Sequence, residues 1–404
     1  MQSDLEDRVF WMAKEDEIKR GMVTDSYFLN TKKVLVENGI NSRVVMEIYA
    51  RELPYDQKWG ILCGIYEVAK LLEGLPIDVW SFSEGEVFLA DGTKSIYEPV
   101  LTIEGRYVDF LEYETAILGL ISASTSIATK AARFRMAAGE STLLSFGTRR
   151  VHPTLSPLVE RSCYIAGFDG VSNVLGAKLL GISPSGTMPH SLIQVIGDQE
   201  KAWKLFDQSV QKEIPRIALV DTFWDEKAES IKAFETLGRR LWGVRLDTPA
   251  SRRGDFRKIV EEVRWELNIR GGKDVKIFVS GRLHEEDVES LKDIVDGFGI
   301  GTSVAYPPVI DFSAKIVEVF NDGQRAFRAK RGGLAGRKYV YRAKGFNDVV
   351  TLSEKPPEHH FPLQHKLIEK GKIVSEFKSP KLIREEVIKK LKSLKRSNPE
   401  LVAL

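Results

Sequence analysis

Short apolar runs, each followed by a polar or glycine-rich turn and then by an amphipathic stretch, fill the chain after Gly139. The strand candidates are TLLSFG, RIALVDT, LWGVRLDT, VKIFVSG and DGFGIGT, and the helices expected between them are 201–213, 226–237, 255–268 and 285–295. Strands that alternate with helices at this pitch predict a parallel sheet, either closed as a barrel or doubly wound. In both architectures the ligand site lies at the carboxyl ends of the strands.

The chain before Gly139 has a different pattern. Between Val44 and Gly105 the β-rich runs RVVMEIYA, DVWSF and PVLTIEG alternate with turns, and one helix is expected near 57–72. Residues 112–139 keep helical spacing with many small side chains, which predicts a long helix packed closely against a neighbour. We therefore expect a small α+β domain, followed by a helix that links it to the next domain.

The chain after Pro308 is β-rich again, with the runs AKIVEVF, RKYVYRA and DVVTLS, and it ends in a charged helix near 383–394. We expect this tail to complete the N-terminal domain, and we interpret its last helix as a solvated one. The predicted domains are 1–120, an α+β domain with the start of the linker helix; 121–305, the α/β domain; and 306–404, an extension that packs on the N-terminal domain.

Composition narrows the class of protein. The 404 residues are 43% hydrophobic and 29% charged, which is typical of a globular protein of two or three domains. Lys and Arg number 59 against 57 Asp and Glu, so no global field would hold the protein on nucleic acid or on an anionic membrane. The charged start lacks the apolar run of a secretory signal, and residues 116–128, the most apolar stretch, are too short to span a bilayer. A cytoplasmic enzyme or binding protein is expected.

The cysteines and most of the histidines give no metal site. Cys63 and Cys163 lack the CxxC spacing of a zinc site and are expected to be buried apolar residues. His359, His360 and His365 lie in a proline-rich loop without carboxylate or cysteine support at ligand spacing, so they predict no metal site either.

Polar residues follow two of the predicted strands. Asp221 ends RIALVDT and Asp247 ends GVRLDT, with Arg245 two residues earlier on the same face of its strand. An aspartate at a strand end can accept ribose hydroxyls or hold Mg²⁺ through water, and a nearby arginine can balance phosphate charge. Either aspartate could instead cap the next helix, but two in equivalent positions favour a ligand site.

Two glycine-rich turns close the repeat. Gly281 stands in VSGRLHEED, and GFGIGTS holds Gly299, Gly301 and Thr302. Backbone N–H groups in such turns can bind phosphate, and the last two turns of a (β/α)₈ barrel are the usual place for it. The chain has no GxxxxGK[ST] and no strand-GxGxxG-helix, so neither a Walker site nor a dinucleotide fold is predicted.

Two further turns carry anion and proton chemistry. SFGTRR holds Arg149 and Arg150, whose planar donor groups suit carboxylate and phosphate. SGTMPHSLIQ holds His190, which we expect in a Gly-Thr-Met-Pro turn at a strand end, where an imidazole can exchange a proton or accept a phosphoryl group. A single histidine is more often structural, so the surrounding motifs decide its interpretation.

Taken together, SFGTRR, VSNVLGAKLLGI, SGTMPHSLIQ, LVDT, GVRLDT, FVSG, GIGTSV and GGLAGRKYVYR resemble nicotinate phosphoribosyltransferase, a type II phosphoribosyltransferase. The segments TDSYFLN and ETAILGL…IATKAAR also fit, so the likeness runs in order from Thr24 to Arg342. It implies an α/β fold, with an irregular (β/α) barrel beside an α+β open-sandwich N-terminal domain that C-terminal chain completes. It also implies transfer of the 5-phosphoribosyl group from phosphoribosyl pyrophosphate to nicotinate, giving nicotinate mononucleotide and pyrophosphate in NAD salvage.

The resemblance implies a role for each candidate residue. Phe146 and Tyr27, the latter from a second subunit, would hold the pyridine ring between them. Arg149, with Arg150 beside it, would reach the nicotinate carboxylate or the pyrophosphate. Ser172 stands where relatives selective for nicotinamide carry an aspartate, which favours nicotinate as the base.

The same resemblance extends to the phosphoribosyl end. His190 corresponds to the histidine that is phosphorylated in members coupling ATP hydrolysis to the transfer. The remaining contacts would be Asp221, Arg245 and Asp247 for ribose, pyrophosphate and Mg²⁺; Gly281, Gly299, Gly301 and Thr302 for the turns that hold the 5-phosphate; and Lys315, Lys330, Arg331 and Arg337 for the pyrophosphate side, supplied in trans.

Two departures limit the transfer of roles. Many relatives read Asp-Ser-Gly-Asp where this chain has Asp247-Thr-Pro-Ala-Ser-Arg-Arg-Gly-Asp, so no role is assigned beyond Asp247. Some archaeal relatives end in a cysteine zinc knuckle, which this chain lacks, so no structural zinc is expected.

The expected partners are therefore nicotinate, phosphoribosyl pyrophosphate, Mg²⁺, ATP as co-substrate and a second copy of the chain, in a homodimer or higher homo-oligomer with shared active sites. Neither nucleic acid nor a membrane is expected as a partner. The alternatives are nicotinamide or quinolinate as the base, a barrel aldolase or isomerase acting on a sugar phosphate, and a non-enzymatic nucleic-acid-binding protein.

Overall fold

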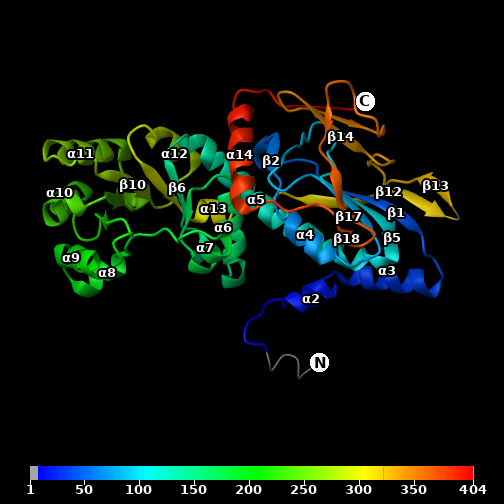
Figure 1. Ribbon diagram of the computed structural model, residues 1–404, viewed down its shortest axis with the longest axis horizontal. Helices are drawn as coiled ribbons and strands as arrows, with labels where there is room; N and C mark the ends of the chain where they lie inside the picture. Colours follow the sequence, from blue (N-terminus) through cyan, green and yellow to red (C-terminus); the bar gives the residue numbers. More distant parts are fainter. Residues whose placement is uncertain (1–7, 322, 404) are drawn as a thin grey trace. The chain divides into compact units, whose positions relative to one another are not determined.

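The computed structural model describes residues 8–321 and 323–403, and its chain divides into two compact units. Unit 1 consists of Met1–Thr129 and Pro308–Leu404, and unit 2 consists of Lys130–Pro307 (Figure 1). Within the described ranges, no helix has both the length and the apolar character that crossing a membrane requires.

Unit 1 is built on a seven-stranded antiparallel sheet in which strands from both ends of the chain pair. Its order is β13-β12-β1-β5-β3-β17-β18. The strands are β1 (Arg43–Ala50), β3 (Asp78–Ser81), β5 (Leu101–Arg106), β12 (Phe312–Asn321), β13 (Gln324–Phe327), β17 (His365–Glu369) and β18 (Lys372–Ile373). In the central pairing Ile48 of β1 lies opposite Ala314 of β12, which confirms that C-terminal chain completes the N-terminal domain.

Smaller sheets and helices complete this unit. The strands are β2 (Trp59–Ile61) and β4 (Val87–Leu89), which pair with each other, and β14 (Tyr339–Ala343), β15 (Asn347–Thr351), β16 (Phe361–Pro362) and β19 (Glu400–Ala403), which form a four-stranded sheet. The helices are α2 (Glu15–Lys19), α3 (Ser26–Glu37), α4 (Ile65–Leu72), α14 (Pro380–Leu394) and the first part of α5 (Glu114–Ala138), which continues into unit 2.

The helix predicted near 57–72 is only half right. Trp59–Ile61 is strand β2, and α4 begins after Gly64, whose φ of 99° a residue with a side chain rarely adopts. A Cβ at Gly64 would also lie 2.7 Å from the Leu120 carbonyl oxygen, so the chain turns here between strand and helix.

A buried ion pair fastens the C-terminal chain to β1 inside unit 1. Lys338 and Glu47 are 3% and 0% exposed, and Lys338 Nζ lies 2.9 Å from Glu47 Oε2. Lys338 Nζ also donates to the carbonyl oxygens of Leu334 and Gly336 at 2.8 Å, so all of its donors are used within the unit.

Unit 2 is a six-stranded parallel sheet with helices between its strands, in the order β7-β6-β11-β10-β9-β8. The strands are β6 (Thr142–Ser145), β7 (Gly170–Val171), β8 (Ile217–Leu219), β9 (Gly243–Leu246), β10 (Lys276–Ser280) and β11 (Gly297–Ile300). The helices are α6 (Ser156–Ile165), α7 (Val174–Leu180), α8 (His190–Ile196), α9 (Gln199–Ser209), α10 (Glu226–Leu237), α11 (Phe256–Ile269), α12 (Glu285–Leu291) and α13 (Thr302–Ala305). All five predicted strands are confirmed, whereas β7, which is only two residues long, was not predicted.

The sheet of unit 2 ends at β7 on one side and at β8 on the other. Across residues 8–321 and 323–403 no strand pairing joins these two edges, so barrel closure stays a prediction. The loop 181–189 bridges part of this interval at the strand ends: Ser185 N donates to Val171 O of β7 at 2.7 Å, and Arg245 of β9 donates to Thr187 Oγ1 at 2.7 Å. A loop therefore stands where a closed barrel would need another strand.

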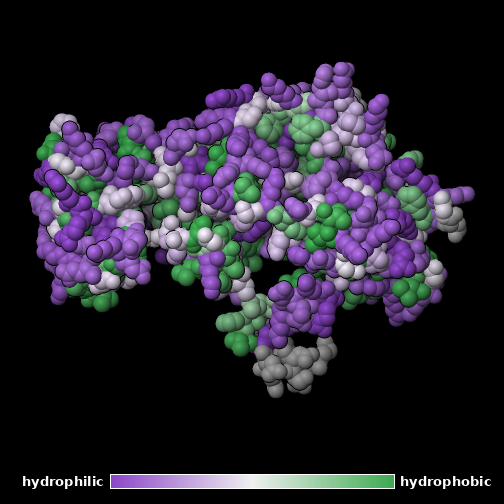
Figure 2. Space-filling model, viewed as in Figure 1, coloured by the Kyte–Doolittle hydropathy of each residue, from purple (hydrophilic) through white to green (hydrophobic). Residues whose placement is uncertain are grey.

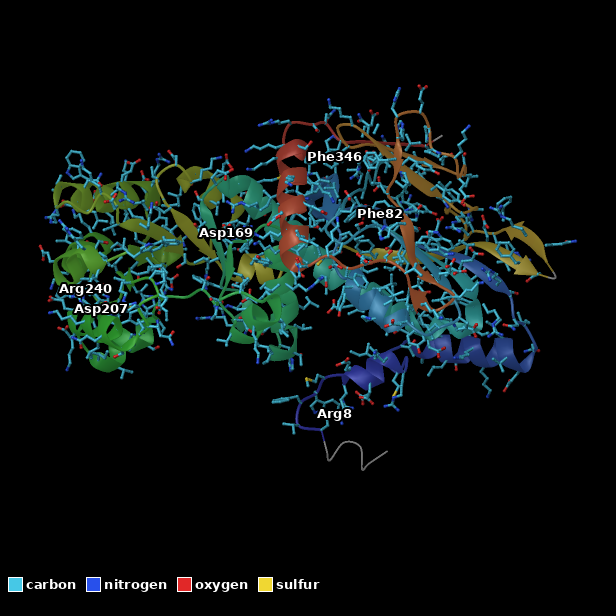
Figure 3. All side chains as sticks on the ribbon, viewed as in Figure 1. Arg8, Phe82, Asp169, Asp207, Arg240 and Phe346 are labelled. Carbon is cyan, nitrogen blue, oxygen red and sulfur yellow. The ribbon has the colours of Figure 1, made fainter. Side chains whose placement is uncertain are left out.

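The outer edge of the sheet is fixed by charged groups that belong to the fold. Asp207 of α9 is paired with Arg216, at 2.9 Å between Oδ1 and Nε, and with Arg240, toward which it points in Figure 3. Arg216 also donates to four carbonyl oxygens between Asp207 and Ile214, at the end of α9 and in the connection to β8. These arginines are thereby used in folding the edge at β8.

Candidate functional site

A cavity of about 440 Å³ opens at the carboxyl ends of the strands of unit 2. Its walls come from the turns after β6, β7, β9, β10 and β11 and from the loop 181–189. The lining residues are Phe146, Thr148, Arg149, Arg150, Ser172, Gly186, Thr187, Met188, Pro189, Arg245, Asp247, Ser280, Gly281, Arg282, Gly299, Gly301 and Thr302. Ten residues predicted for the site, which are far apart in sequence, therefore share one cavity.

Phe146 supplies an aromatic face to this cavity. Its backbone N donates to Ile300 O at 2.8 Å, which extends the pairing of β6 with β11 by one residue. The ring lies directly over Gly299, where an added Cβ would meet Phe146 Cε2 at 2.3 Å. Arg245 lies 5.8 Å from the ring centroid on the cavity side of β9. Gly299 thus has a steric role, because the ring fills the space that a side chain would need.

Two arginines and a serine form the wall beside Phe146. Arg149 and Arg150 belong to a 3₁₀ turn, Thr148–Arg150, and both are exposed. The turn is held close to α13, since a Cβ at Gly147 would lie 2.5 Å from Ala305 Cβ. Ser172 follows β7, and its backbone N donates to Ser145 O at 3.1 Å.

His190 meets two aspartates at the strand ends. It is the first residue of α8, after the loop 181–189, so the expected turn at a strand end is wrong: β7, the preceding strand, ends at Val171. His190 Nδ1 lies 3.1 Å from Thr222 Oγ1, and Nε2 lies 3.5 Å from Asp247 Oδ2 and 3.8 Å from Asp221 Oδ1.

The two aspartates are themselves linked. Asp221 Oδ2 accepts from the backbone N of Asp247 at 2.9 Å, and Asp247 Oδ1 accepts from Ser280 Oγ at 2.6 Å. Neither caps a helix, since Asp225 caps α10 and Asp255 caps α11. The capping alternative is therefore wrong for both.

Burial separates the acidities of this cluster. Burial raises the pKa of Asp221 to about 7, and the charge of Asp247 adds to the effect, although His190 opposes it. Burial would raise the pKa of Asp247 too, but hydrogen bonds from His190 and Ser280 outweigh it and hold that pKa below its usual range. The hydrogen bond to Asp247 raises the pKa of His190 against the effect of burial. The cluster can therefore hold or release a proton near neutral pH.

Two arginines at the strand ends were missed by the sequence analysis. Arg282 lines the cavity and has a φ of 50°, directly after Gly281 with a φ of 93°. Arg253 donates through Nε to Thr248 O at 3.0 Å and through Nη2 to Ser280 O at 3.2 Å, which ties the turn after β9 to the end of β10. Their signals were present in VSGRL, where the expected contact was assigned to Gly281, and in ASRRGD, to which no role was assigned.

The remaining predicted residues lie in unit 1. Tyr27 is exposed on α3 and donates to Asp25 Oδ2 at 3.3 Å, and Lys315 is half-buried on β12. Arg337 lies 3.8 Å from the Trp80 ring centroid and donates to Glu104 at 3.2 Å. Lys330 and Arg331 are exposed. These five side chains belong to unit 1, whereas the residues that line the cavity belong to unit 2.

Metal ligands are sparse in the described ranges. No group of three or more His, Cys, Asp or Glu side chains within residues 8–321 and 323–403 could hold a metal ion. Cys63 and Cys163 are both fully buried, as expected of small apolar residues. A cation at the strand ends would therefore need water or a ligand to complete its coordination.

Comparison with known proteins identifies the family. Two family models match: the N-terminal domain of quinolinate phosphoribosyl transferase over residues 25–125 and its C-terminal domain over residues 127–315. The chain is 49% identical to nicotinate-nucleotide pyrophosphorylase from Pyrococcus furiosus, whose crystal structure superposes with a TM-score of 0.91 over 96% of this chain and 99% of that one.

More distant relatives agree. Nicotinate phosphoribosyltransferase from Bacillus subtilis is 28% identical over 81% of this chain and 74% of its own length. Human nicotinic acid phosphoribosyltransferase is 19% identical, and its crystal structure has the same fold, with a TM-score of 0.74 over 95% of this chain and 97% of that one. The chain belongs to the type II phosphoribosyltransferase family, in which the nicotinate and quinolinate enzymes share this two-domain fold.

Proposed function

We propose that the protein transfers the 5-phosphoribosyl group of phosphoribosyl pyrophosphate to nicotinate, giving nicotinate mononucleotide and pyrophosphate in NAD salvage. The observation that carries the proposal is the single cavity at the strand ends, where an aromatic face and two arginines stand with an Asp–His cluster and two glycine turns. Each of these features suits one part of the substrates. The aromatic face suits the flat pyridine ring, the arginines suit its carboxylate, and the glycine turns suit a phosphate.

The base would lie on Phe146, with its carboxylate toward Arg149 and Arg150. Both guanidinium groups are exposed at the cavity wall, and a planar donor pair suits a planar carboxylate. Ser172 leaves this wall without the negative charge that an aspartate would bring, which favours nicotinate over nicotinamide.

The phosphoribosyl part would fill the opposite turns. Gly281, Gly301 and Thr302 line the cavity there, and their backbone N–H groups are the donors we assign to the 5-phosphate. Arg245, which is fixed by Thr187, would neutralise the pyrophosphate, and Asp247 would meet the ribose hydroxyls.

In the reaction, the bond from the pyridine nitrogen to ribose C1 forms while the bond from C1 to the pyrophosphate oxygen breaks. The nitrogen lone pair is free in nicotinate, so the site needs no general base and acts by positioning and electrostatics. Negative charge at Asp221 and Asp247 would favour the positive ribose ring of an oxocarbenium-like transition state.

Mg²⁺ fits the aspartate pair. Asp221 Oδ1 is buried and has no hydrogen-bond partner in the described part of the chain, so one carboxylate oxygen is left for a cation or its water. When bound, Mg²⁺ would neutralise the pyrophosphate and stabilise it as a leaving group.

Coupling to ATP is the part of the proposal that concerns His190. Thr222 fixes Nδ1, which leaves Nε2 toward the carboxylates and the cavity edge. Transfer of the Nε2 proton to Asp247 or Asp221 would free the Nε2 lone pair, while the Nδ1 proton stays toward Thr222. Attack of Nε2 on the γ-phosphorus of ATP would then form an N–P bond as the bond from that phosphorus to the bridging oxygen breaks and ADP leaves. Replacing His190 with alanine should abolish ATP stimulation but keep slow basal transfer; unchanged stimulation would contradict the assignment.

A second copy of the chain would complete the site. The side chains of Val9, Phe10, Trp11, Tyr27, Leu29 and Val34 are all more than half exposed, and Figure 2 shows apolar surface in this part of unit 1. Exposed apolar side chains in such number favour an interface. A homodimer through this surface would bring Tyr27 of one copy to the Phe146 ring of the other. The protein would act as a cytoplasmic enzyme.

The decisive experiment is to incubate the purified protein with phosphoribosyl pyrophosphate and Mg²⁺ and one base at a time, with and without ATP, and to detect the mononucleotide. Nicotinate should give the highest kcat/KM, and nicotinamide the lowest. Quinolinate is the second candidate, because both matched family models carry its name. A higher kcat/KM for quinolinate, with release of CO₂, would replace nicotinate in the proposal.

A further inference from the structure

Glu160 is a fully buried acid directly behind the cavity wall. It lies on α6 with 0% of its surface exposed, and its Oε1 accepts from the backbone N of Asn173 at 2.9 Å. A Cβ at Gly176 of α7 would meet Glu160 Cγ at 2.8 Å, so the glycine provides the room for this side chain. The absence of a side chain at Gly176 therefore leaves room for an acid beneath the turn that carries Ser172.

Its environment favours the neutral form of the carboxyl group. Burial raises the pKa of Glu160, and interactions with Ser145, Asn173 and Ser172 offset only part of that effect. Oε2 is buried, and no atom of residues 8–321 and 323–403 stands in hydrogen-bond geometry to it; the same is true of Ser145 Oγ. A buried ionised oxygen without a protein donor in hydrogen-bond geometry is costly, whereas a protonated one can donate to a nearby hydroxyl oxygen.

Glu160 is connected to the cavity through two serines. Ser145 ends β6, and its carbonyl oxygen accepts from Ser172 N at 3.1 Å. Ser172 lines the cavity wall, and both serines are close enough to Glu160 to influence the pKa of its carboxyl group. Negative charge on Glu160 would therefore lie one residue behind the surface that meets the base.

The other charged or titratable groups around Glu160 are mostly exposed. On α6 and the elements packed against it they are Arg161, Cys163 and Tyr164 of α6 itself, Arg149 and Arg150 of the 3₁₀ turn, His152 at the start of the next 3₁₀ turn (Pro153–Leu155), and Lys178 of α7. His152 is an exposed histidine close to α6, so it is the natural control for a pH effect.

We propose that Glu160 is a positioning residue that orients Ser172 behind the base and favours binding of the nicotinate carboxylate while the Glu160 carboxyl group is uncharged. The inference rests on the proposed function and adds a determinant of base recognition to it. Protonated Glu160 holds Asn173 N through Oε1 and directs its proton toward the serines. Ionised Glu160 repels a carboxylate in the cavity, and neutral nicotinamide is affected less.

The test is the pH dependence of KM for nicotinate, measured between about pH 5 and about pH 9 in the wild type, Glu160→Gln and His152→Gln. In the wild type and in His152→Gln, KM for nicotinate should rise about tenfold as Glu160 ionises, the effect of a like charge at roughly 10 Å in partly screened surroundings. In Glu160→Gln this rise should be absent, and KM for phosphoribosyl pyrophosphate should follow one pH profile in all three proteins.

Three outcomes would overturn the inference. One is the same rise in Glu160→Gln as in the wild type, and another is a rise that disappears in His152→Gln instead. The third is failure of Glu160→Gln to fold, measured by thermal unfolding, because a neutral isostere should satisfy a site built for a neutral acid.

A measurement without substrate separates this inference from the proposed function. The infrared difference spectrum between the wild type and Glu160→Gln at neutral pH should contain the C=O band of a protonated carboxyl group. A carboxylate band in its place would overturn the inference. Absence of transfer to any pyridine base in the wild type, with the protonated band present, would instead count against the proposed function alone.

Discussion

Gly299→Ala should impair recognition of the base through one steric contact. The added Cβ would lie 2.3 Å from Phe146 Cε2 and 2.5 Å from Cδ2. Carbon atoms pack at about 3.5 Å or more, so the ring must move by roughly 1.2 Å. Because the backbone of Gly299 is fixed between β6 and β10, the ring gives way, and it moves into the space proposed for nicotinate.

The expected effects follow from that displacement. Overpacking should lower the free energy of unfolding by about 1–3 kcal/mol. A misplacement of about 1 Å can cost about 100-fold in rate, so kcat/KM for nicotinate should fall by about that factor, or about 2.7 kcal/mol. The assays are urea unfolding and steady-state kinetics with nicotinate as the varied substrate.

Gly297→Ala is the matched control. It lies two residues earlier on the same face of β11, and its Cβ would meet Phe278 Cε1 at 2.4 Å and Thr142 Cβ at 3.0 Å, in the core and not in the cavity. It should lose similar stability but raise KM for nicotinate less than Gly299→Ala does, because it displaces Phe278 and reaches Phe146 only through the packing of that cluster. The reasoning would be refuted if both variants raised KM equally, or if Gly299→Ala left kcat/KM unchanged.

Three further predictions concern other parts of the molecule. The raised pKa of Asp221 favours the protonated folded state, so the stability of the wild type should fall as pH rises from about 3.8 to about 7. Asp221→Asn should remove this fall. Urea unfolding at both ends of that pH range measures it, and an unchanged slope would contradict the assignment. Tyr27→Ala and Phe146→Ala should each be inactive alone but regain about a quarter of wild-type activity after subunit exchange, because one site of the mixed dimer is intact; no recovery would argue against a shared site. Lys338→Met should lower the free energy of unfolding by about 3–5 kcal/mol, because it leaves Glu47 charged and unpaired. The double variant with Glu47→Gln should recover part of that free energy in urea unfolding. An equal loss in the single and double variants would refute the pairing argument.

Much of the fold followed from local pattern. The apolar runs at β6 and β8 to β11, and the long helix α5, stand where hydrophobic periodicity predicted them. The prediction failed for β7, since two residues carry no periodicity, and for Trp59–Ile61, where a glycine with positive φ separates strand from helix. The pairing of β1 with β12 joins residues more than 250 positions apart, and it was expected from the resemblance and the renewed β-rich texture rather than from any local signal.

The candidate site was predicted as a set of residue types more than as a geometry. Glycines and aspartates at strand ends could be recognised because parallel strands bring their carboxyl ends to one edge. Arg282 and Arg253 were missed because the sequence alone does not distinguish an arginine in a site from one on the surface. Only its neighbours in the structure make that distinction. The position of His190 at the start of a helix could not be foreseen, because it depends on the loop 181–189 and its contacts with β7 and Arg245.

The sequence by itself determined the alternation of strand and helix and the residues with chemistry at the strand ends, because both are local properties of side-chain type and spacing. Only the tertiary structure decided which of those residues meet. Burial raises the pKa of Asp221, whereas hydrogen bonds from His190 and Ser280 lower that of Asp247. Packing also places an acid, Glu160, behind Ser172, which stands twelve positions later in the chain. Electrostatic energy depends on distance and solvent access, and both are fixed only when the strands and helices of unit 2 pack together.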